Sequence, residues 1–104
     1  MDFADVFAAV ARLQEELKEF ALAHKSGNAE ETEKELGDVL FAAVNVGRLA
    51  GCDCEKALKE SAQRFAARFT LAESLALKDG RVVTKLSEAE WDKYYLAAKE
   101  QLKK

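Results

Sequence analysis

Two short acidic motifs in the first half of the chain have the residue types and spacing to hold a metal ion. Glu16 and Glu19 lie in the motif EELKE, and Glu35 and Asp38 lie in the motif ELGD. In each motif the two acids are three residues apart, which places them on one face of a helix. Each motif therefore offers a pair of carboxylates to one side of its helix.

The distance of each pair from a central turn decides whether the pairs can meet. The segment between the motifs contains one turn signal, Gly27-Asn28. If this turn joins antiparallel helices, Glu19 lies eight residues before Gly27 and Glu35 lies seven after Asn28. At about 1.5 Å per residue both pairs lie roughly 10–17 Å from the turn, and packed helix axes are about 8–10 Å apart. The four carboxylates are predicted to converge.

Converging carboxylates need a cation, because like charges held close together raise one another's pKa and resist burial. A site made only of oxygen ligands favours a hard ion, Mg²⁺ or Mn²⁺, over zinc or copper. Isolated acids on helices are usually just solvated. The matched distances of the two pairs from the turn favour the metal site over that interpretation.

Other metal and nucleophile chemistries do not fit the sequence. A di-iron bundle requires Glu-x-x-His pairs, and the single histidine, His24, has Ala21 three positions before it. Cys52 and Cys54 lack the further cysteine or histidine ligands of a zinc site. There is no glycine-rich phosphate loop after a strand and no nucleophile triad. Metal-assisted chemistry at the carboxylates remains.

Composition and length predict a single all-α domain over residues 1–104. Apolar residues make up 49% and charged residues 34% of the chain, with five glycines and no proline, a balance that suits long helices. The net charge of −3, with acids and bases interspersed, provides no basic surface for a nucleic-acid polymer or an anionic membrane. A domain of this size can be completed by a second copy, so a homodimer or a dimer of dimers is expected.

Targeting signals are not expected. The start MDFADVF lacks the basic and apolar regions of a signal peptide, and the longest apolar run, residues 39–44, is too short to span a bilayer. Two cysteines one residue apart do not form the spaced framework of small secreted domains. We expect a cytoplasmic protein.

Apolar periodicity and capping residues predict four helices that position these groups. The first covers about 2–25, the second opens at Asn28 and runs to Gly51, the third is capped by Asp53 and ends before Gly80, and the last opens with the capping box Ser87/Glu90. Residues 80–86 are predicted to form an ordered loop. Trp91, Tyr94 and Tyr95 give the last helix an aromatic stripe, which is usually core.

Three further polar residues have two interpretations each. Asn45 continues the line of Glu35, Asp38 and Ala42 along the second helix, so it either pairs locally in the core or contacts a ligand beside Ala42. Arg64 and Arg68 share a helix face. They either reach an anion or are solvated and paired with nearby glutamates.

The order EELKE, ELGD, DVLFAAVNVGRLAG and SAQRFAARF resembles the MazG family of nucleoside triphosphate pyrophosphohydrolases. The similarity runs from about residue 10 to residue 69, and the last helix shows weaker similarity. The chain is most similar to the C-terminal of the two repeated domains in long bacterial members. The resemblance implies an all-α, four-helix fold of antiparallel helices that is completed by dimerisation.

The resemblance also implies a substrate and a site. Water would attack a nucleoside triphosphate between the α and β phosphates, releasing pyrophosphate and a monophosphate. It implies that Mg²⁺, for which Mn²⁺ can substitute, is bound by Glu16, Glu19, Glu35 and Asp38. Glu15 would orient or deprotonate the water, or it would hold the metal ligands in position without binding the ion itself. The implied substrate contacts are Asn45, Arg64, Arg68, Lys99 and, at the place of a family tryptophan, either Trp91 or Tyr95.

The resemblance leaves two functions to compare. The first is hydrolysis of noncanonical or surplus nucleotides, a house-cleaning activity. The second is a non-catalytic helical dimer that binds nucleotide or metal as a sensor or assembly module, since Ala62 stands where relatives commonly have asparagine. The four metal ligands are all present, which favours the enzyme.

Overall fold

The computed structural model describes residues 3–103, which form four α-helices and one 3₁₀ turn and contain no strand. The helices are α1 (Phe3–Ser26), α2 (Ala29–Leu49), α3 (Cys54–Lys78) and α4 (Glu88–Leu102). The prediction of an all-α fold is confirmed, and the helix bounds lie within two residues of those predicted. The chain forms two compact units, Met1–Ala57 and Leu58–Lys104.

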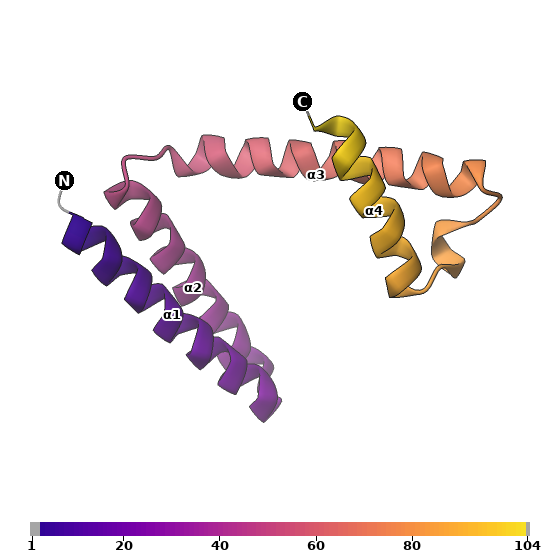
Figure 1. The fold of residues 1–104 in the computed structure, drawn as a ribbon. Helices are drawn as coiled ribbons and strands as arrows, with labels where there is room; N and C mark the ends of the chain where they lie inside the picture. Colours follow the sequence, from indigo (N-terminus) through magenta and orange to yellow (C-terminus); the bar gives the residue numbers. More distant parts are fainter. Residues whose placement is uncertain (1–2, 104) are drawn as a thin grey trace. The chain divides into compact units, whose positions relative to one another are not determined.

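The first unit is a helical hairpin in which α1 and α2 pack side by side (Figure 1). The predicted turn joins them: Gly27 has a φ of +80°, a conformation that favours glycine. The Asn28 side chain accepts a hydrogen bond from the Glu31 amide at 3.0 Å and so caps α2. The small buried residues Ala9, Ala23 and Ala42 lie on these two helices, where small side chains allow close packing. The two acidic motifs therefore face each other across the hairpin.

The second unit is held together by aromatic contacts between α3 and α4. Phe65 contacts Tyr95 with ring centroids 5.8 Å apart, and Phe69 contacts Trp91 at 4.9 Å. Such tilted ring pairs add to the free energy gained from burying their surface. The aromatic stripe predicted for the last helix thus packs against α3.

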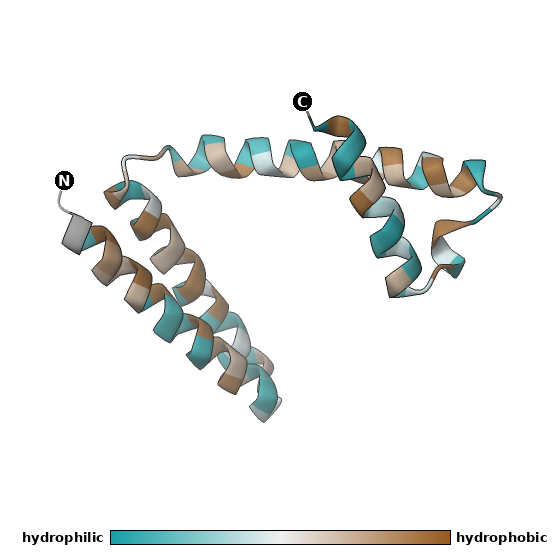
Figure 2. Cartoon of the chain, viewed as in Figure 1, coloured by the Kyte–Doolittle hydropathy of each residue, from teal (hydrophilic) through white to brown (hydrophobic). Residues whose placement is uncertain are grey.

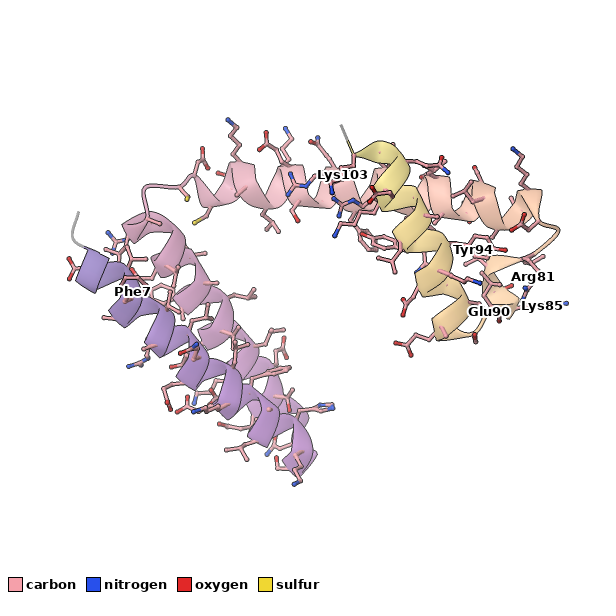
Figure 3. All side chains as sticks on the ribbon, viewed as in Figure 1. Phe7, Arg81, Lys85, Glu90, Tyr94 and Lys103 are labelled. Carbon is pink, nitrogen blue, oxygen red and sulfur yellow. The ribbon has the colours of Figure 1, made fainter. Side chains whose placement is uncertain are left out.

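Polar contacts fix the connector between α3 and α4, where η1 (Val83–Lys85) forms a 3₁₀ turn within the predicted loop. The Tyr94 hydroxyl donates to Asp79 at 2.8 Å, and Arg81 pairs with Glu90 (Figure 3). The predicted capping box of Ser87 and Glu90 is present. Hydrogen bonds from the Ser87 amide and from Arg81 lower the pKa of Glu90 to about 2.

Many large apolar side chains of the first unit are exposed. Hydrophobic residues recur along both helices of the hairpin (Figure 2), and Leu22, Leu40, Phe41 and Val44 are each more than half exposed. No helix among the described residues is both long and apolar enough to cross a membrane. Exposed apolar side chains that lie together on a surface often mark a place where a partner binds.

Candidate metal centre

Three carboxylates from two helices converge in the hairpin. Glu16 on α1 and Glu35 and Asp38 on α2 each offer one oxygen, and these oxygens all lie within 4.8 Å of one another. Glu16 is 6% exposed and Glu35 is 9% exposed, whereas Asp38 is open to solvent. The matched distances from the Gly27-Asn28 turn produce this arrangement. We refer to Glu16, Glu35 and Asp38 as the carboxylate trio.

Two oxygens of the trio are buried without a hydrogen-bond partner. Glu16 Oε2 and Glu35 Oε2 have none among the described residues. The other oxygen of Glu16 accepts a hydrogen bond from Arg12 Nε at 3.0 Å, and that of Glu35 lies 3.9 Å from Lys34 Nζ. Buried acceptors that lack donors are costly, and a bound cation would satisfy both. The trio therefore fits a hard divalent ion, which prefers oxygen ligands.

Glu19, the fourth predicted ligand, lies beside the trio rather than in it. It is exposed, and a hydrogen bond with Glu16, followed by repulsion from the Glu16 charge, raises its pKa. The pKa of Glu35 is also raised, first by burial and then by the charges of Asp38, Glu31 and Glu16, against the opposing effect of Lys34. Both shifts have the sign expected for carboxylates that are crowded together.

A cleft of about 550 Å³ opens over these groups. It is lined by Arg12, Glu15, Glu16, Glu19, Lys34, Glu35 and Asp38. We call it the carboxylate cleft. Glu15 is thus placed at the same cleft as the trio, and its carboxylate lies 3.7 Å from Lys18.

A second pocket of about 280 Å³ adjoins the cleft on the same hairpin. It is lined by Arg12, Glu16, Asp38, Phe41, Ala42 and Asn45, and we call it the Asn45 pocket. The predicted line along α2 is therefore continuous from the trio into this pocket. Asn45 also pairs locally, because its side-chain oxygen accepts a hydrogen bond from Arg48 at 2.8 Å. Asn45 is half-buried and this local bond is exposed rather than in the core, whereas its contact with a ligand stays a prediction.

The cationic residues predicted for substrate binding come together in the second unit. Arg64, Arg68 and Lys99 line one pocket of about 450 Å³ between α3 and α4, together with Ala67, Glu100, Leu102 and Lys103. We call it the cationic pocket. Lys103, near the end of α4 (Figure 3), was not predicted, although it follows Lys99 by one helical turn. Trp91 and Tyr95 do not line this pocket and instead pack on Phe69 and Phe65.

Arg12 is the residue that sequence reasoning missed in the first unit. It pairs with Glu16 and lines both the carboxylate cleft and the Asn45 pocket. The signal was present, because a basic residue four positions before an acid on a helix can pair with it.

Comparisons with known proteins find matches over the part of the chain that contains the carboxylate trio. Residues 5–70 match the MazG nucleotide pyrophosphohydrolase domain, and this segment contains both acidic motifs. The chain is 37% identical over 98 residues to the nucleoside triphosphate pyrophosphohydrolase/pyrophosphatase MazG of Thermotoga maritima. It is 38% identical over 66 residues to the uncharacterized protein YabN of Bacillus subtilis. No solved structure gives a significant match.

The alignments cover most of the present chain but only a small part of each relative. The alignments cover 94% and 64% of the present chain, but only 37% of the Thermotoga protein and 14% of the Bacillus protein. The chain therefore spans much less than two thirds of the length of these relatives. The domain match covers more than half of the chain and includes the whole carboxylate trio. The chain belongs to the MazG nucleotide pyrophosphohydrolase domain family.

Proposed function

We propose that this protein is a Mg²⁺-dependent hydrolase that converts nucleoside triphosphates to monophosphate and pyrophosphate. Its substrates would be ribo- or deoxyribonucleotides of the cytoplasmic pool, including noncanonical ones, so that its role is nucleotide house-cleaning. The observation that carries the proposal is the pair of buried, unpartnered oxygens of Glu16 and Glu35 within the trio. The name of the Thermotoga relative supports the same activity.

The chain offers ligands for the metal and a group for the water. Glu16, Glu35 and Asp38 would hold the ion, with Glu19 beside them as a fourth ligand. Mg²⁺, or Mn²⁺ in its place, would neutralise phosphate charge and make a water more acidic. Glu15 lines the same cleft and would orient that water or accept its proton.

Each unit by itself has residues that we propose as substrate contacts. Ala42 leaves room in the Asn45 pocket for a sugar or base, whose polar edge Asn45 would bind. In the second unit, Arg64, Arg68 and Lys99 would bind phosphate oxygens, because the cationic pocket concentrates positive charge around a single acid, Glu100. Trp91 or Tyr95 would offer an aromatic face to the base.

The protein is further proposed to act as a homodimer or a dimer of dimers. Leu22, Leu40 and Val44 are exposed large apolar residues of the hairpin, and burying such residues against a second copy stabilises association. Sedimentation equilibrium is expected to give at least twice the 11.5 kDa mass of one chain. A mass of one chain at all concentrations would contradict this part of the proposal.

Release of pyrophosphate is the direct test of the activity. The protein would be incubated with a panel of canonical and damaged ribo- and deoxyribonucleoside triphosphates, with Mg²⁺ and with EDTA. We expect metal-dependent formation of pyrophosphate and monophosphate without diphosphate, and the panel reports the preferred base and sugar. If folded, metal-supplied protein hydrolyses none of them, the non-catalytic sensor or assembly module becomes the better explanation.

A further inference from the structure

Cys52 and Cys54 both contact Gly47, near the end of α2. The Cys52 amide donates a hydrogen bond to the Gly47 carbonyl at 2.9 Å, directly after Gly51 with its positive φ, and this bond closes the C-terminal turn of α2. The Cys54 sulfur lies so close to Gly47 that a side chain on residue 47 would overlap it. One residue of the first unit therefore holds both cysteines in place.

The two thiols differ in what surrounds them. Cys54 is half-buried, and its Sγ donates a hydrogen bond to the Val44 carbonyl at 3.4 Å. The space that this sulfur fills exists because Gly47 has no side chain. Cys52 is exposed, and neither cysteine is in a disulfide. The pair thus consists of an accessible thiol and a second thiol that connects the first residue of α3 to α2.

A disulfide between the two cysteines is within reach of the chain. The Cα atoms of residues two apart are separated by at most about 7 Å, and disulfides span about 4.4–6.8 Å. The hydrogen bond to Val44 uses the S–H hydrogen of Cys54, and a disulfide sulfur carries no hydrogen. Formation of the disulfide therefore breaks the bond between Cys54 and Val44.

We propose that Cys52 and Cys54 form a reversible disulfide by exchange with a small-molecule disulfide such as oxidised glutathione. The Cys52 thiolate attacks one sulfur of oxidised glutathione, which forms a mixed disulfide and releases one glutathione thiolate. The Cys54 thiolate then attacks the Cys52 sulfur, and the second glutathione leaves as a thiolate. The two protein thiols lose two electrons and two protons, and one oxidised glutathione becomes two thiols.

Oxidation would loosen the contact between α2 and the start of α3. The Asp53 side chain accepts a hydrogen bond from the Lys56 amide at 3.0 Å, so α3 keeps its cap when the bond from Cys54 to Val44 is lost. Asp38 lies more than one helical turn before Val44, so the carboxylate trio is not part of the change. The proposed disulfide is therefore independent of the proposed hydrolase activity.

Two simpler explanations make different predictions. If Cys54 only fills the space beside Gly47, an oxidant would leave a glutathione on Cys52, because no second thiol would displace it. If Cys52 reacts mainly with other copies of the chain, the product would be a disulfide-linked dimer. An internal disulfide is distinguished from both by the mass of the product.

The test incubates the full chain in buffers with an increasing ratio of oxidised to reduced glutathione. The remaining thiols would be alkylated and the products identified by mass spectrometry. Cys54→Ser is the matched control, because a serine hydroxyl can keep the bond to Val44 but cannot form a disulfide. Gly47→Ala leaves both cysteines unchanged, and its methyl group displaces the Cys54 sulfur. Hydrogen exchange would be measured at the amides of the first two turns of α3.

We expect the wild type to lose both thiols to an internal disulfide and to regain them in excess reduced glutathione. Cys54→Ser should instead retain one glutathione on Cys52. In the oxidised wild type the first two turns of α3 should exchange faster than in the reduced protein, whereas Cys54→Ser should show no such change. In the reduced protein Gly47→Ala should raise the alkylation rate of Cys54 by about twofold to tenfold, because the thiol has lost one hydrogen bond.

Three results would overturn the inference. A wild type that stays reduced, or that stops at a glutathione adduct or a linked dimer, would show that no internal disulfide forms. Oxidation without faster exchange in α3 would show that Cys54 does not hold the start of that helix. An unchanged alkylation rate of Cys54 in Gly47→Ala would show that the space beside residue 47 does not protect the thiol.

Discussion

Replacing Glu35 with glutamine is expected to reduce pyrophosphate release by at least about a hundredfold, because metal catalysis supplies several kcal/mol of transition-state stabilisation. Glutamine keeps the size of the side chain but removes the charge at an oxygen that is buried without a partner. Asp38→Asn should have an effect of the same order, since Asp38 offers the third oxygen of the trio. Initial rates at saturating Mg²⁺ and nucleotide would measure the loss.

A control on the same helix separates a ligand effect from a general charge effect. Glu33 is an exposed acid of α2 that lines neither the carboxylate cleft nor the Asn45 pocket. Glu33→Gln should therefore retain nearly wild-type turnover. Wild-type turnover in Glu35→Gln would place the metal elsewhere, and an equal loss in Glu33→Gln would show that acidity of the surface alone matters.

The second large effect is on the free energy of unfolding. Glu35→Gln should be less stable than the wild type when metal is bound and more stable when it is not. Mn²⁺ or Mg²⁺ at a hundred times its dissociation constant should raise the free energy of unfolding of the wild type by about 2.7 kcal/mol, if it binds the folded state alone. Glu35→Gln should lose most of this gain. Without metal the same variant should be more stable than the wild type near pH 8, because it removes one of several crowded carboxylates.

The pH dependence follows from the raised pKa of Glu35. A carboxyl whose pKa is higher in the folded state than its ordinary 4.5 contributes stability below that value and loses it as the pH rises through the folded pKa. The metal-free wild type should therefore lose stability relative to Glu35→Gln as the pH rises from 4.5 to about 8. Glu90, with its pKa of about 2, contributes in the opposite direction, but only as the pH falls below 4.5.

Chemical denaturation with and without metal, at both pH values, would measure these differences. Glu33→Gln again serves as the control, because its exposed charge lies outside the cleft. A metal-free Glu35→Gln protein less stable than the wild type at pH 8 would contradict the repulsion argument. Full metal stabilisation of that variant would contradict the assignment of Glu35 as a ligand.

Much of the fold was predictable because local chemistry decides where these helices start and stop. Asn28 and Ser87 accept the amide hydrogen bonds expected of cap residues, and Gly27 and Gly80 have the positive φ angles expected after helix ends. The convergence of Glu16 with Glu35 followed from counting residues on either side of one turn. Both inferences use only residue types and their spacing along the chain.

Contacts between residues distant in sequence were not predictable in the same way. The bonds from Tyr94 to Asp79 and from Arg81 to Glu90 depend on the path of the connector, which no periodic pattern specifies. Glu19 lies on the same helix face as Glu16 but is exposed. Residues that share a helix face can be buried to different extents. Spacing selects a face of a helix, whereas packing decides which residues on that face are buried.

The position of the carboxylates within a single hairpin has a consequence for the order of folding. Every acid of the proposed centre, from Glu15 to Asp38, belongs to α1 or α2, on either side of the Gly27-Asn28 turn. Closing such a short connection costs little chain entropy, and contacts of this local kind are among the fastest to form. The carboxylates therefore approach one another during the first tertiary step, and their repulsion opposes it. A divalent cation would then speed the assembly of the hairpin in addition to stabilising the finished protein.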